Sequence, residues 1–436
     1  MSLIKKSLSR RNLLKGAGAA SLLPLLTACG ATQLSKGTAG QVVVVGGGFG
    51  GATAAKYIKK ANPAVAVTLV EPKKVFYTCP FSNLVLAGER SLDAIAHNYE
   101  ELKQVYGVRV IHQKAEDVDP VAHRVKLDKG ASLHYDRLIL SPGIDIRWDA
   151  LEGYDSAAAE LAPHAWQAGE QTRLLRRQLE AMDDGDTFIL SAPANPFRCP
   201  PGPYERASLI AHYFKHHKPR SKVLILDAKD SFSKQGLFTS AWQELYGDRI
   251  EWVGLSGDGQ VVRVDAKRRQ VETEFGSLHQ AGVLNVVPPQ KAGLIAQRAG
   301  VTDASGWAPV NPRTFESELA KDIYVIGDAS IAAPMPKSGF AANAQGKVAA
   351  AAILASLEAK PAVDPHWANT CYSLVTPDYG ISVAGVYRVE DNLIVSPQGS
   401  GGLSPASAEP WVRKAEAEYA VGWYEAISQD TWGTAY

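Results

Sequence analysis

Four cysteines are the residues of this chain best suited to redox chemistry. Cys29 lies in an N-terminal segment typical of an export signal, which leaves Cys79, Cys199 and Cys371 for the folded protein. A thiolate can exchange with a disulfide through a mixed intermediate. Because three is an odd number, at least one of these cysteines must be free or bonded to something other than cysteine.

The first 37 residues are predicted to direct export rather than to fold. Residues 9–15 carry a twin-arginine pattern, and the apolar run at 16–28 is too short to span a bilayer. The Leu-Thr-Ala-Cys at 26–29 resembles a lipoprotein cleavage box. Cys29 is therefore either lipidated, which would tether the protein to a membrane, or removed with an ordinary signal peptide. Either reading predicts a periplasmic protein, in a compartment that permits disulfides.

The elements that must position a cofactor begin with a strand, a glycine-rich turn, a helix and a second strand. Residues 41–45 and 65–70 are apolar runs typical of buried parallel strands, and 52–60 favour a helix. The turn fits G-x-G-x-x-G, which lets a pyrophosphate approach the helix N-terminus, and an acid at the second strand end can bind a ribose hydroxyl. The expected contacts to FAD from this unit are Gly46, Gly48, Gly51 and Glu71.

A second unit of the same kind is predicted, with strands at 187–190 and 222–226 and a helix at 203–217. Its first turn, residues 192–203, carries five prolines in place of glycines. A proline has no N–H, and its ring blocks the close approach of a phosphate. We therefore expect no nucleotide here, and we place Cys199 where a nicotinamide cofactor would otherwise bind.

Near the end of the third quarter of the chain, a strand at 323–326 ends in Gly327 and Asp328. In flavoproteins with two dinucleotide-type domains, such a Gly-Asp closes the FAD domain and meets the ribityl chain. The alanine-rich helix at 341–355 would point its N-terminus at the isoalloxazine. Lys337 could then stabilise negative charge on the reduced flavin, or it could be a solvated loop lysine.

These elements predict an α/β fold with two Rossmann-like domains and a C-terminal α+β interface domain. One Rossmann-like domain binds FAD and the other is a degenerate NAD-like domain. The formal net charge of +1 argues against nucleic acid as a partner. The expected divisions are a signal at 1–37, an FAD domain at 38–151 and 290–360, an NAD-like domain without nucleotide at 152–289, and a C-terminal domain at 361–436.

Six short motifs surround the cysteines and the expected flavin. They are Tyr-Thr-Cys at 77–79, Pro-Phe-Arg-Cys-Pro-Pro-Gly-Pro-Tyr-Glu-Arg-Ala at 196–207, Gly-Asp-Ala at 327–329, Pro-Met-Pro-Lys-Ser-Gly at 334–339, Asn-Thr-Cys-Tyr-Ser at 369–373 and Asp-Tyr-Gly-Ile-Ser-Val-Ala at 378–384. From about residue 40 to its end, the chain resembles the flavoprotein subunit of flavocytochrome c sulfide dehydrogenase. That family belongs to the glutathione-reductase-like flavoproteins, close to sulfide:quinone oxidoreductases.

The resemblance implies a role for each cysteine. Cys79 would carry FAD through a thioether to the flavin 8α-methyl, and Cys199 and Cys371 would form a redox disulfide beside the isoalloxazine. Glu205 would be the proton acceptor near that disulfide. Pro80 departs from the pattern, because an aromatic residue is expected after Cys79, and this departure bears on the covalent link. The alternatives are an inert structural disulfide, a small buried hydrophobe at Cys79 and a helix N-terminal carboxylate at Glu205.

Sulfide is the electron donor that the resemblance implies. Hydrosulfide is a strong nucleophile and a two-electron donor, and a disulfide sulfur is its natural target. By analogy with the family, we place the persulfide on Cys199 and Cys371 nearer the flavin. The function expected is oxidation of sulfide to sulfur or polysulfide.

The electrons must then pass to a partner. The chain has no Cys-x-x-Cys-His and no iron–sulfur spacing, so we expect no haem on it. The family supplies a c-type cytochrome subunit as heterodimer partner. The aromatic-rich C-terminal segment is either its docking surface or core. We expect no metal site, since His212 and His216 lie on a helix face without a completing carboxylate.

Three rival functions stay open. A sulfide:quinone oxidoreductase would share the half-reaction, although the polar C-terminal end at 413–431 argues against quinone binding. An NAD(P)H-dependent disulfide reductase is disfavoured by the proline-rich turn. A non-catalytic flavoprotein that binds persulfide or anchors a cytochrome would not be bleached by sulfide.

Overall fold

The structure is a computed structural model that describes residues 39–433. The expected export signal at 1–37, with Cys29, lies outside the described residues, as do residues 434–436. The described residues belong to one compact unit.

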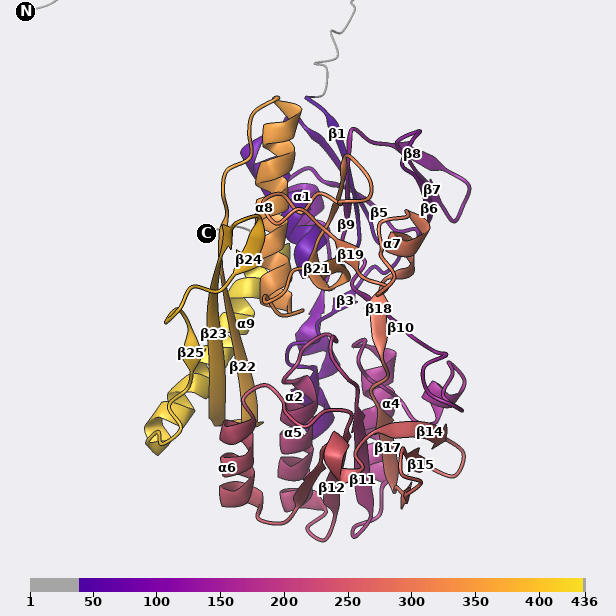
Figure 1. Cartoon of the computed structure of the whole chain (residues 1–436), viewed down its shortest axis with the longest axis vertical. Helices are drawn as coiled ribbons and strands as arrows, with labels where there is room; N and C mark the ends of the chain where they lie inside the picture. Colours follow the sequence, from indigo (N-terminus) through magenta and orange to yellow (C-terminus); the bar gives the residue numbers. More distant parts are fainter. Residues whose placement is uncertain (1–38, 434–436) are drawn as a thin grey trace, which may run out of the picture. The chain divides into compact units, whose positions relative to one another are not determined.

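A five-stranded sheet forms the first layer, and every neighbouring pair in it is parallel. Its order is β20 (Ile323–Val325), β9 (Arg137–Leu140), β1 (Gln41–Val45), β2 (Ala66–Val70) and β5 (Arg109–Ile111). After its first residue β1 is four buried valines, as expected for a strand covered on both faces. Helices α1 (Phe49–Ala61) and α8 (Gly339–Leu357) pack against each other beside this sheet (Figure 1). Because β1 leads into α1 and β20 leads toward α8, both helix N-termini lie at the carboxyl edge of the sheet.

A second parallel sheet has the order β13, β12, β11, β17. The bounds are β11 (Thr187–Ala192), β12 (Lys222–Asp227), β13 (Ile250–Val253) and β17 (Val283–Val286), with helices α4 (Glu170–Ala181), α5 (Gly202–His217) and α6 (Gln235–Tyr246). The predicted strand–helix–strand unit is confirmed, since α5 connects β11 to β12. Cys199 therefore stands directly before α5.

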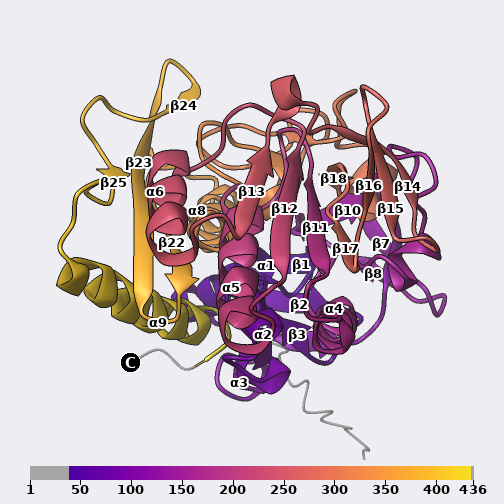
Figure 2. The ribbon, with the colours of Figure 1, turned by 90° about the horizontal axis from the view of Figure 1, so that it is seen from below.

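The C-terminal layer is an antiparallel hairpin crossed by one long helix. Strands β22 (His366–Thr376) and β23 (Tyr379–Glu390) pair in a register that sets Cys371 opposite Val383. Helix α9 (Pro410–Trp432) packs on both strands. Figure 2 shows α5 between this hairpin and the strands β11 and β12, and α5 contacts both β22 and β12. The fold thus brings Cys371 to the helix that follows Cys199.

Shorter elements connect these layers. They are β3 (Phe76–Tyr77), α2 (Ser82–Ala87), β4 (Ala96–His97), α3 (Glu100–Gln104), β6 (Ala115–Asp119), β7 (Arg124–Leu127), β8 (Ser132–His134), β10 (Ile144–Ile146), β14 (Val261–Asp265), β15 (Gln270–Thr273), β16 (Leu278–Gln280), β18 (Gln290–Ala292), α7 (Leu294–Arg298), β19 (Ala308–Pro309), β21 (Ser330–Ile331), β24 (Leu393–Val395) and β25 (Gly402–Leu403). The antiparallel pair of β10 and β18 lies where the chain passes from the first sheet to the second and back. The α/β fold agrees with the prediction. The domain limits stay a prediction, and the strands of each sheet fall within them.

Candidate active site

The glycine-rich turn after β1 is shaped by close approaches that a side chain would prevent. Gly46 has φ +102°, and a Cβ on it would come within 2.2 Å of the Ser141 carbonyl oxygen. A Cβ on Gly51 would come within 2.0 Å of the Gly46 carbonyl oxygen. Gly48 caps α1 without a side-chain hydrogen bond, so the helix N-terminus faces the cavity beyond it. This is the arrangement that binds phosphates.

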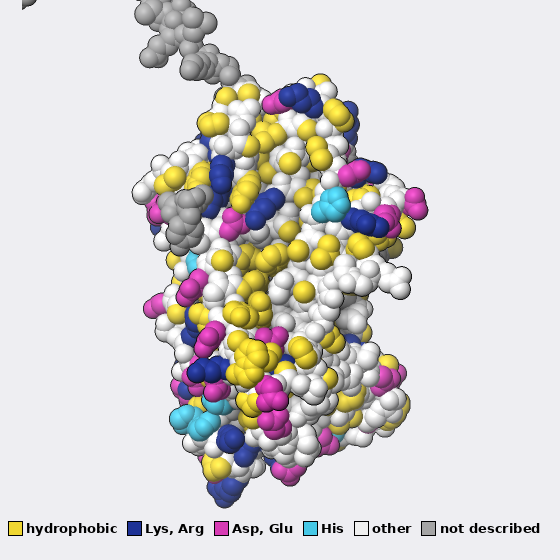
Figure 3. Space-filling view, turned by 90° about the vertical axis from the view of Figure 1, so that its left-hand side faces the viewer, with side chains coloured by type: hydrophobic (Ala, Val, Ile, Leu, Met, Phe, Trp, Pro, Cys, Tyr) yellow, Lys and Arg dark blue, Asp and Glu magenta, His cyan; other side chains and the backbone are white. Residues whose placement is uncertain are grey.

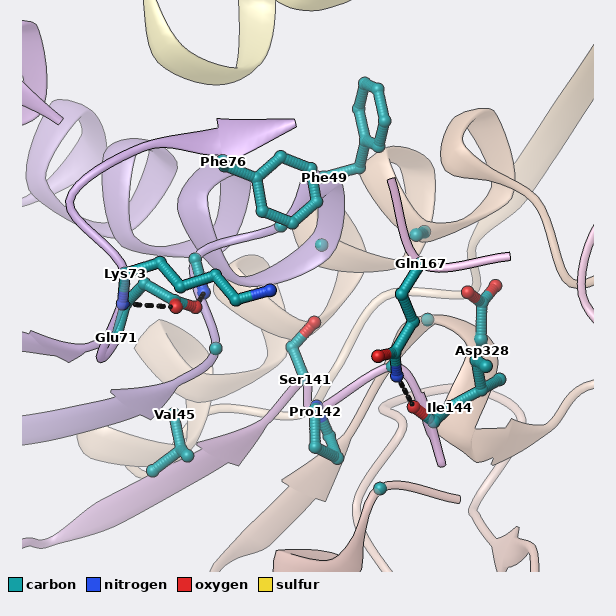
Figure 4. A pocket seen from close by; sticks show the side chains of 18 of the residues that line it. Val45, Phe49, Glu71, Lys73, Phe76, Ser141, Pro142, Ile144, Gln167 and Asp328 are labelled. Atoms are coloured by element: carbon teal, nitrogen blue, oxygen red, sulfur yellow. Dashed lines mark hydrogen bonds between the residues drawn. The ribbon is translucent and has the colours of Figure 1, made fainter. Parts of the chain in front are cut away.

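Glu71 directly follows β2 and holds the glycine-rich turn in place through backbone hydrogen bonds. One carboxylate oxygen accepts the Gly47 N–H at 2.9 Å, and the other accepts the Lys73 N–H at 3.0 Å. Each oxygen keeps a second lone pair for a ribose hydroxyl. Figure 4 shows the Lys73 side chain extending into the cavity from the same end.

Asp328 lies at the other end of the same cavity, in the short turn after β20. Its Oδ1 is buried without a hydrogen-bond partner, and its Oδ2 lies 3.9 Å from Arg198 Nη1. Burial raises the pKa of Asp328. Figure 4 shows the carboxylate pointing into the cavity opposite Glu71 and Lys73. An unsatisfied buried acceptor here fits a polyol hydroxyl of a bound dinucleotide.

The cavity between these two ends has a volume of about 430 Å³. Its lining includes the glycine turn, Glu71, Cys79, Gly327, Asp328 and the N-terminus of α8 at Ser338 and Gly339. The cavity is lined by the open N-terminus of α1, by Glu71 as a possible ligand of a ribose hydroxyl, and by Asp328, whose Oδ1 has no hydrogen-bond partner. The residues present therefore fit FAD, and all the predicted cofactor contacts except Gly51 line this cavity.

A second cavity of about 80 Å³ brings together Cys79, Cys199, Cys371 and Glu205. The three cysteines are free thiols in the structure, so the disulfide between Cys199 and Cys371 stays a prediction. The two cavities share the lining residues Cys79, Pro80, Arg198, Ser338 and Gly339. Cys79 therefore lies at the boundary between the cofactor cavity and the cysteine cavity.

Cys199 is held in a strained turn before α5. Its φ is +58°, in the left-handed region that residues with a Cβ rarely adopt. The Cys199 N–H donates to the Lys337 carbonyl oxygen at 2.8 Å, and its carbonyl oxygen accepts the Gly202 N–H at 2.8 Å. Burial raises the pKa of the Cys199 thiol well above its ordinary value. Such strain is typical of functional sites that their surroundings fix in place.

Glu205, in the first turn of α5, joins that helix to the strand of Cys371. Its Oε1 accepts the Leu374 N–H at 2.9 Å, and its Oε2 accepts the Asn83 amide at 2.8 Å. Burial raises the pKa of the Glu205 carboxyl, and these two hydrogen bonds oppose that rise. A carboxyl in such surroundings can take up and release a proton closer to neutral pH than usual.

Lys337 is the predicted catalytic residue that lines neither of the two cavities. Its Nζ donates to the carbonyl oxygens of Asp328 and Ser330, both at 2.8 Å, and lies 3.8 Å from the centre of the Trp307 ring. Burial lowers the pKa of Lys337 to about 8. The ammonium thus supports the Gly327–Asp328 turn through its backbone, and its role toward a reduced flavin stays a prediction.

Sequence reasoning missed several polar residues around the cysteines. Arg206 is fully buried, and its guanidinium donates to the carbonyl oxygens of His164 and Ala165 and to the side chains of Asn83 and Asn285. Lys234 donates to the Cys371 carbonyl oxygen. The adjacency of Arg206 to Glu205 in the sequence was a usable signal, whereas nothing local marked Lys234.

The aromatic C-terminal segment divides between core and surface. Tyr424 and Trp432 are each 3% exposed, whereas Trp411 is 71% exposed. Within residues 39–433, no group of three or more His, Cys, Asp or Glu side chains could hold a metal ion. None of the described helices is long and apolar enough to cross a membrane.

Three family descriptions match successive parts of the chain. Residues 40–181 match "Pyridine nucleotide-disulphide oxidoreductase". Residues 172–288 match "Sulfide dehydrogenase [flavocytochrome c] flavoprotein chain, central". Residues 363–432 match "Flavocytochrome c sulphide dehydrogenase, flavin-binding".

Individual proteins give the same picture. The sulfide dehydrogenase [flavocytochrome c] flavoprotein chain of Chlorobaculum thiosulfatiphilum is 69% identical over 45 residues, which are 94% of that sequence and 10% of this chain. The mitochondrial sulfide:quinone oxidoreductase of Mus musculus is 24% identical over 318 residues, covering 71% of this chain and 69% of the relative. The crystal structure of sulfide:quinone oxidoreductase from Aquifex aeolicus has a TM-score of 0.71 at 17% identity and covers 91% of this chain and 93% of that one. At that identity the structural likeness shows the fold alone.

Proposed function

The chain belongs to the flavoprotein family of flavocytochrome c sulfide dehydrogenases, and on that premise we propose that it oxidises sulfide through Cys199 and Cys371 beside a bound FAD. The observation that carries the proposal is the cysteine cavity, which contains both thiols and Glu205 and shares Cys79 with the cofactor cavity. FAD, when bound, supplies the two-electron acceptor for this chemistry.

The chain's own residues account for the sulfur chemistry. Hydrosulfide attacks one sulfur of a Cys199–Cys371 disulfide, the S–S bond breaks, and one cysteine becomes a persulfide while the other leaves as a thiolate. Glu205, which faces the same cavity, takes the proton that the persulfide releases. Arg206, a buried residue in the lining of the cavity, balances the negative charges formed there. A further hydrosulfide attacks the outer sulfur of the persulfide, the S–S bond to the cysteine breaks, and the sulfur leaves as polysulfide, from which elemental sulfur can form, while the cysteine thiolate remains. The two electrons of the cysteine pair would pass to bound FAD as the disulfide re-forms.

We also propose that Cys79 carries FAD through a thioether. Its position supports this, because Cys79 lines both the cofactor cavity and the cysteine cavity. The Cys79 thiol donates only a weak 3.3 Å hydrogen bond, to the Trp166 carbonyl oxygen. Intact mass after denaturation tests the link. A mass equal to the chain plus FAD supports it, and free FAD with the bare chain mass would refute it.

A c-type cytochrome subunit is the electron acceptor we propose, as the family name implies. The C-terminal layer supports this, because α9 and β22 line the cysteine cavity and the same layer exposes apolar side chains. Figure 3 views the side on which β23, β25 and α9 lie, and hydrophobic side chains gather along it. The exposed apolar residues of these elements are Val386, Leu403, Trp411 and Tyr419. A sulfide:quinone activity is the second candidate, favoured by the relatives named above.

Export by the twin-arginine route to the periplasm, with a lipid on Cys29 as membrane tether, is a further part of the proposal. It is supported by the sequence pattern at 9–29. Cell fractionation and the mass of the mature N-terminus test it. A chain that keeps residue 1 and stays in the cytoplasm would refute it.

The deciding experiment is an anaerobic sulfide titration of the native protein purified in detergent. We expect sulfide to bleach the flavin in the wild type and not in Cys199→Ser or Cys371→Ser, each loaded with FAD to the same level. Co-purifying haem and reduction of cytochrome c, rather than of a ubiquinone analogue, would identify the acceptor. Absence of bleaching in the wild type would refute the enzyme, and full activity in either serine variant would refute the disulfide.

A further inference from the structure

Lys234 is a buried cation that the chemistry above does not use. Lys234 stands immediately before α6 with a backbone φ of +62°, and only 4% of its surface is exposed to solvent. A left-handed backbone is unfavourable for a residue with a Cβ. A buried ammonium is also unfavourable unless it is paired. Glycine or asparagine would suit this backbone conformation better. We therefore infer that the lysine side chain has a role of its own at this position.

The Lys234 ammonium reaches from the second sheet to the strand that carries Cys371. Its Nζ donates to the Cys371 carbonyl oxygen at 3.1 Å and to Ser373 Oγ at 2.8 Å. Glu205 accepts the Leu374 N–H one residue further along. The stretch 371–374 is therefore held from the NAD-like domain by one cation and one carboxyl. Cys371 also lines the cysteine cavity.

The charges around the two thiols are unequal. Burial raises the pKa of both thiols, and Lys234 opposes this rise at Cys371. The ionisable groups that act on Cys371 are Lys234 and Glu205. At Cys199, Cys371, Cys79 and Glu205 add to the rise, Arg198 opposes it, and the buried Arg206 also interacts with this thiol. The ionisable groups that act on Lys234 are Cys371, Glu205, Cys199 and Glu416. Cys371 is thus the cysteine whose own carbonyl oxygen accepts a hydrogen bond from the buried lysine.

We propose that Lys234 is a positioning residue that makes Cys371, and not Cys199, the thiolate that leaves when sulfide opens the disulfide. This inference rests on the proposed function. Hydrosulfide bonds to the Cys199 sulfur, the S–S bond breaks, and its electron pair stays on Cys371. The immediate products are a Cys199 persulfide, which still carries the hydrosulfide proton until Glu205 takes it, and a Cys371 thiolate, so one negative charge stands on each side of this step. Disulfide exchange favours the better-stabilised leaving thiolate.

The test uses the full-length protein with its FAD, reduced to the dithiol. Alkylation of each cysteine by iodoacetamide is followed by peptide mass spectrometry across a pH series. In the wild type, we expect Cys371 to become reactive at lower pH than Cys199. Lys234→Gln keeps a hydrogen-bond donor and loses the charge. At pH values below the pKa of the Cys371 thiol, this variant should slow the alkylation of Cys371 about tenfold. Lys234→Arg should restore most of the rate. Lys222→Gln, at a lysine that is 57% exposed and paired with Asp248, is the control for the loss of a positive charge.

Two results would overturn the proposal: Cys199 reacting at the same or lower pH than Cys371 in the wild type, or an unchanged Cys371 profile in Lys234→Gln. The comparison of Cys371 with Cys199 in the wild type tests the proposal even if Lys234→Gln does not fold. Because alkylation needs no sulfide, the outcome is separate from the proposed function. Sulfide that bleaches the flavin with no effect of Lys234 would overturn only this inference, whereas a Lys234 effect without bleaching would overturn only the enzyme.

Discussion

The hydroxyl of Tyr204 donates a 2.6 Å hydrogen bond to the Asp227 carboxylate, at the strand end where a second dinucleotide would place its ribose. Trp252 Nε1 donates to the same oxygen at 2.9 Å, and Lys229 Nζ lies 2.5 Å from the other oxygen. Asp227 is fully buried. The acid that could bind a nucleotide is therefore satisfied by the protein, and the turn at 192–203, which would bind the phosphates, carries five prolines that lack an N–H.

NADH is accordingly expected neither to bind nor to bleach the flavin. The measurement is an anaerobic spectrum of the FAD-loaded protein with excess NADH, with sulfide added afterwards as the positive control. Bleaching by NADH at a rate comparable to that by sulfide would show that the second unit still admits a nucleotide.

Loss of the Asp227 carboxylate should destabilise the fold. Asp227→Ala leaves Lys229 buried without its ion pair, and breaking a buried pair in this way costs about 3–5 kcal/mol of unfolding free energy. Denaturant titration measures it. The matched control is Asp248→Ala, whose side chain is 90% exposed in its pair with Lys222 and should change the unfolding free energy by less than about 1 kcal/mol. Equal changes in unfolding free energy for the two variants would contradict a stabilising role of the buried Asp227 carboxylate.

Glu205 should give sulfide oxidation an acid limb in its pH profile. Burial raises the pKa of Glu205, so the carboxyl gains its proton above the usual pH for a glutamate and no longer accepts one below that point. The rate of flavin reduction by sulfide should fall as pH falls through this pKa. Glu205→Gln should lower the rate roughly 100-fold and remove the limb, measured by stopped-flow absorbance. Glu170→Gln, 80% exposed, is the control, and a limb that survives in Glu205→Gln would assign it to another group.

The fold and the main site residues were predictable because their signals are local. The spacing of Gly46, Gly51 and Glu71 along one strand–turn–helix–strand unit fixes their relative positions before any tertiary contact forms. The prolines around Cys199 likewise excluded a phosphate from within a single loop. Motif resemblance then linked Cys371 to this site, which no periodicity could have done across the intervening chain.

The rest depended on contacts through space. Lys234 lies 137 residues from Cys371, and only the packing of α6 against β22 brings their atoms together. Lys337 precedes α8 in sequence, yet the carbonyl oxygens of Asp328 and Ser330 decide where its ammonium lies. A buried polar side chain takes the direction of its available acceptors, and those acceptors are set by the tertiary fold.

The glycine turn gives a prediction on cofactor binding. Gly46→Ala would put a Cβ within 2.2 Å of the Ser141 carbonyl oxygen on a backbone with φ +102°, so the turn must deform. We expect the purified variant to lose most of its FAD, measured as flavin absorbance per chain. Gly236→Ala, in α6 with open space around the new methyl, is the control and should keep full FAD and gain about 0.5–1 kcal/mol of stability. Full FAD content in Gly46→Ala would contradict the role of the glycine-rich turn in binding FAD.

Lys337 should make the stability of the protein rise with pH in an alkaline window. Burial lowers its pKa from 10.5 to about 8, so between these values the unfolded chain binds a proton that the folded chain does not. Unfolding free energy rises with pH wherever the unfolded state binds more protons, and this shift corresponds to about 3 kcal/mol. The unfolding free energy of the wild type, relative to that of Lys337→Met, should therefore increase by up to that amount as the pH rises from about 8 to 10.5. This gain is lost again as the pH falls back to about 8. Denaturant titrations at several pH values measure it, with Lys222→Met, 57% exposed, as the control. Parallel curves for the wild type and Lys337→Met would show that the buried ammonium stays charged throughout, held by the carbonyl oxygens of Asp328 and Ser330.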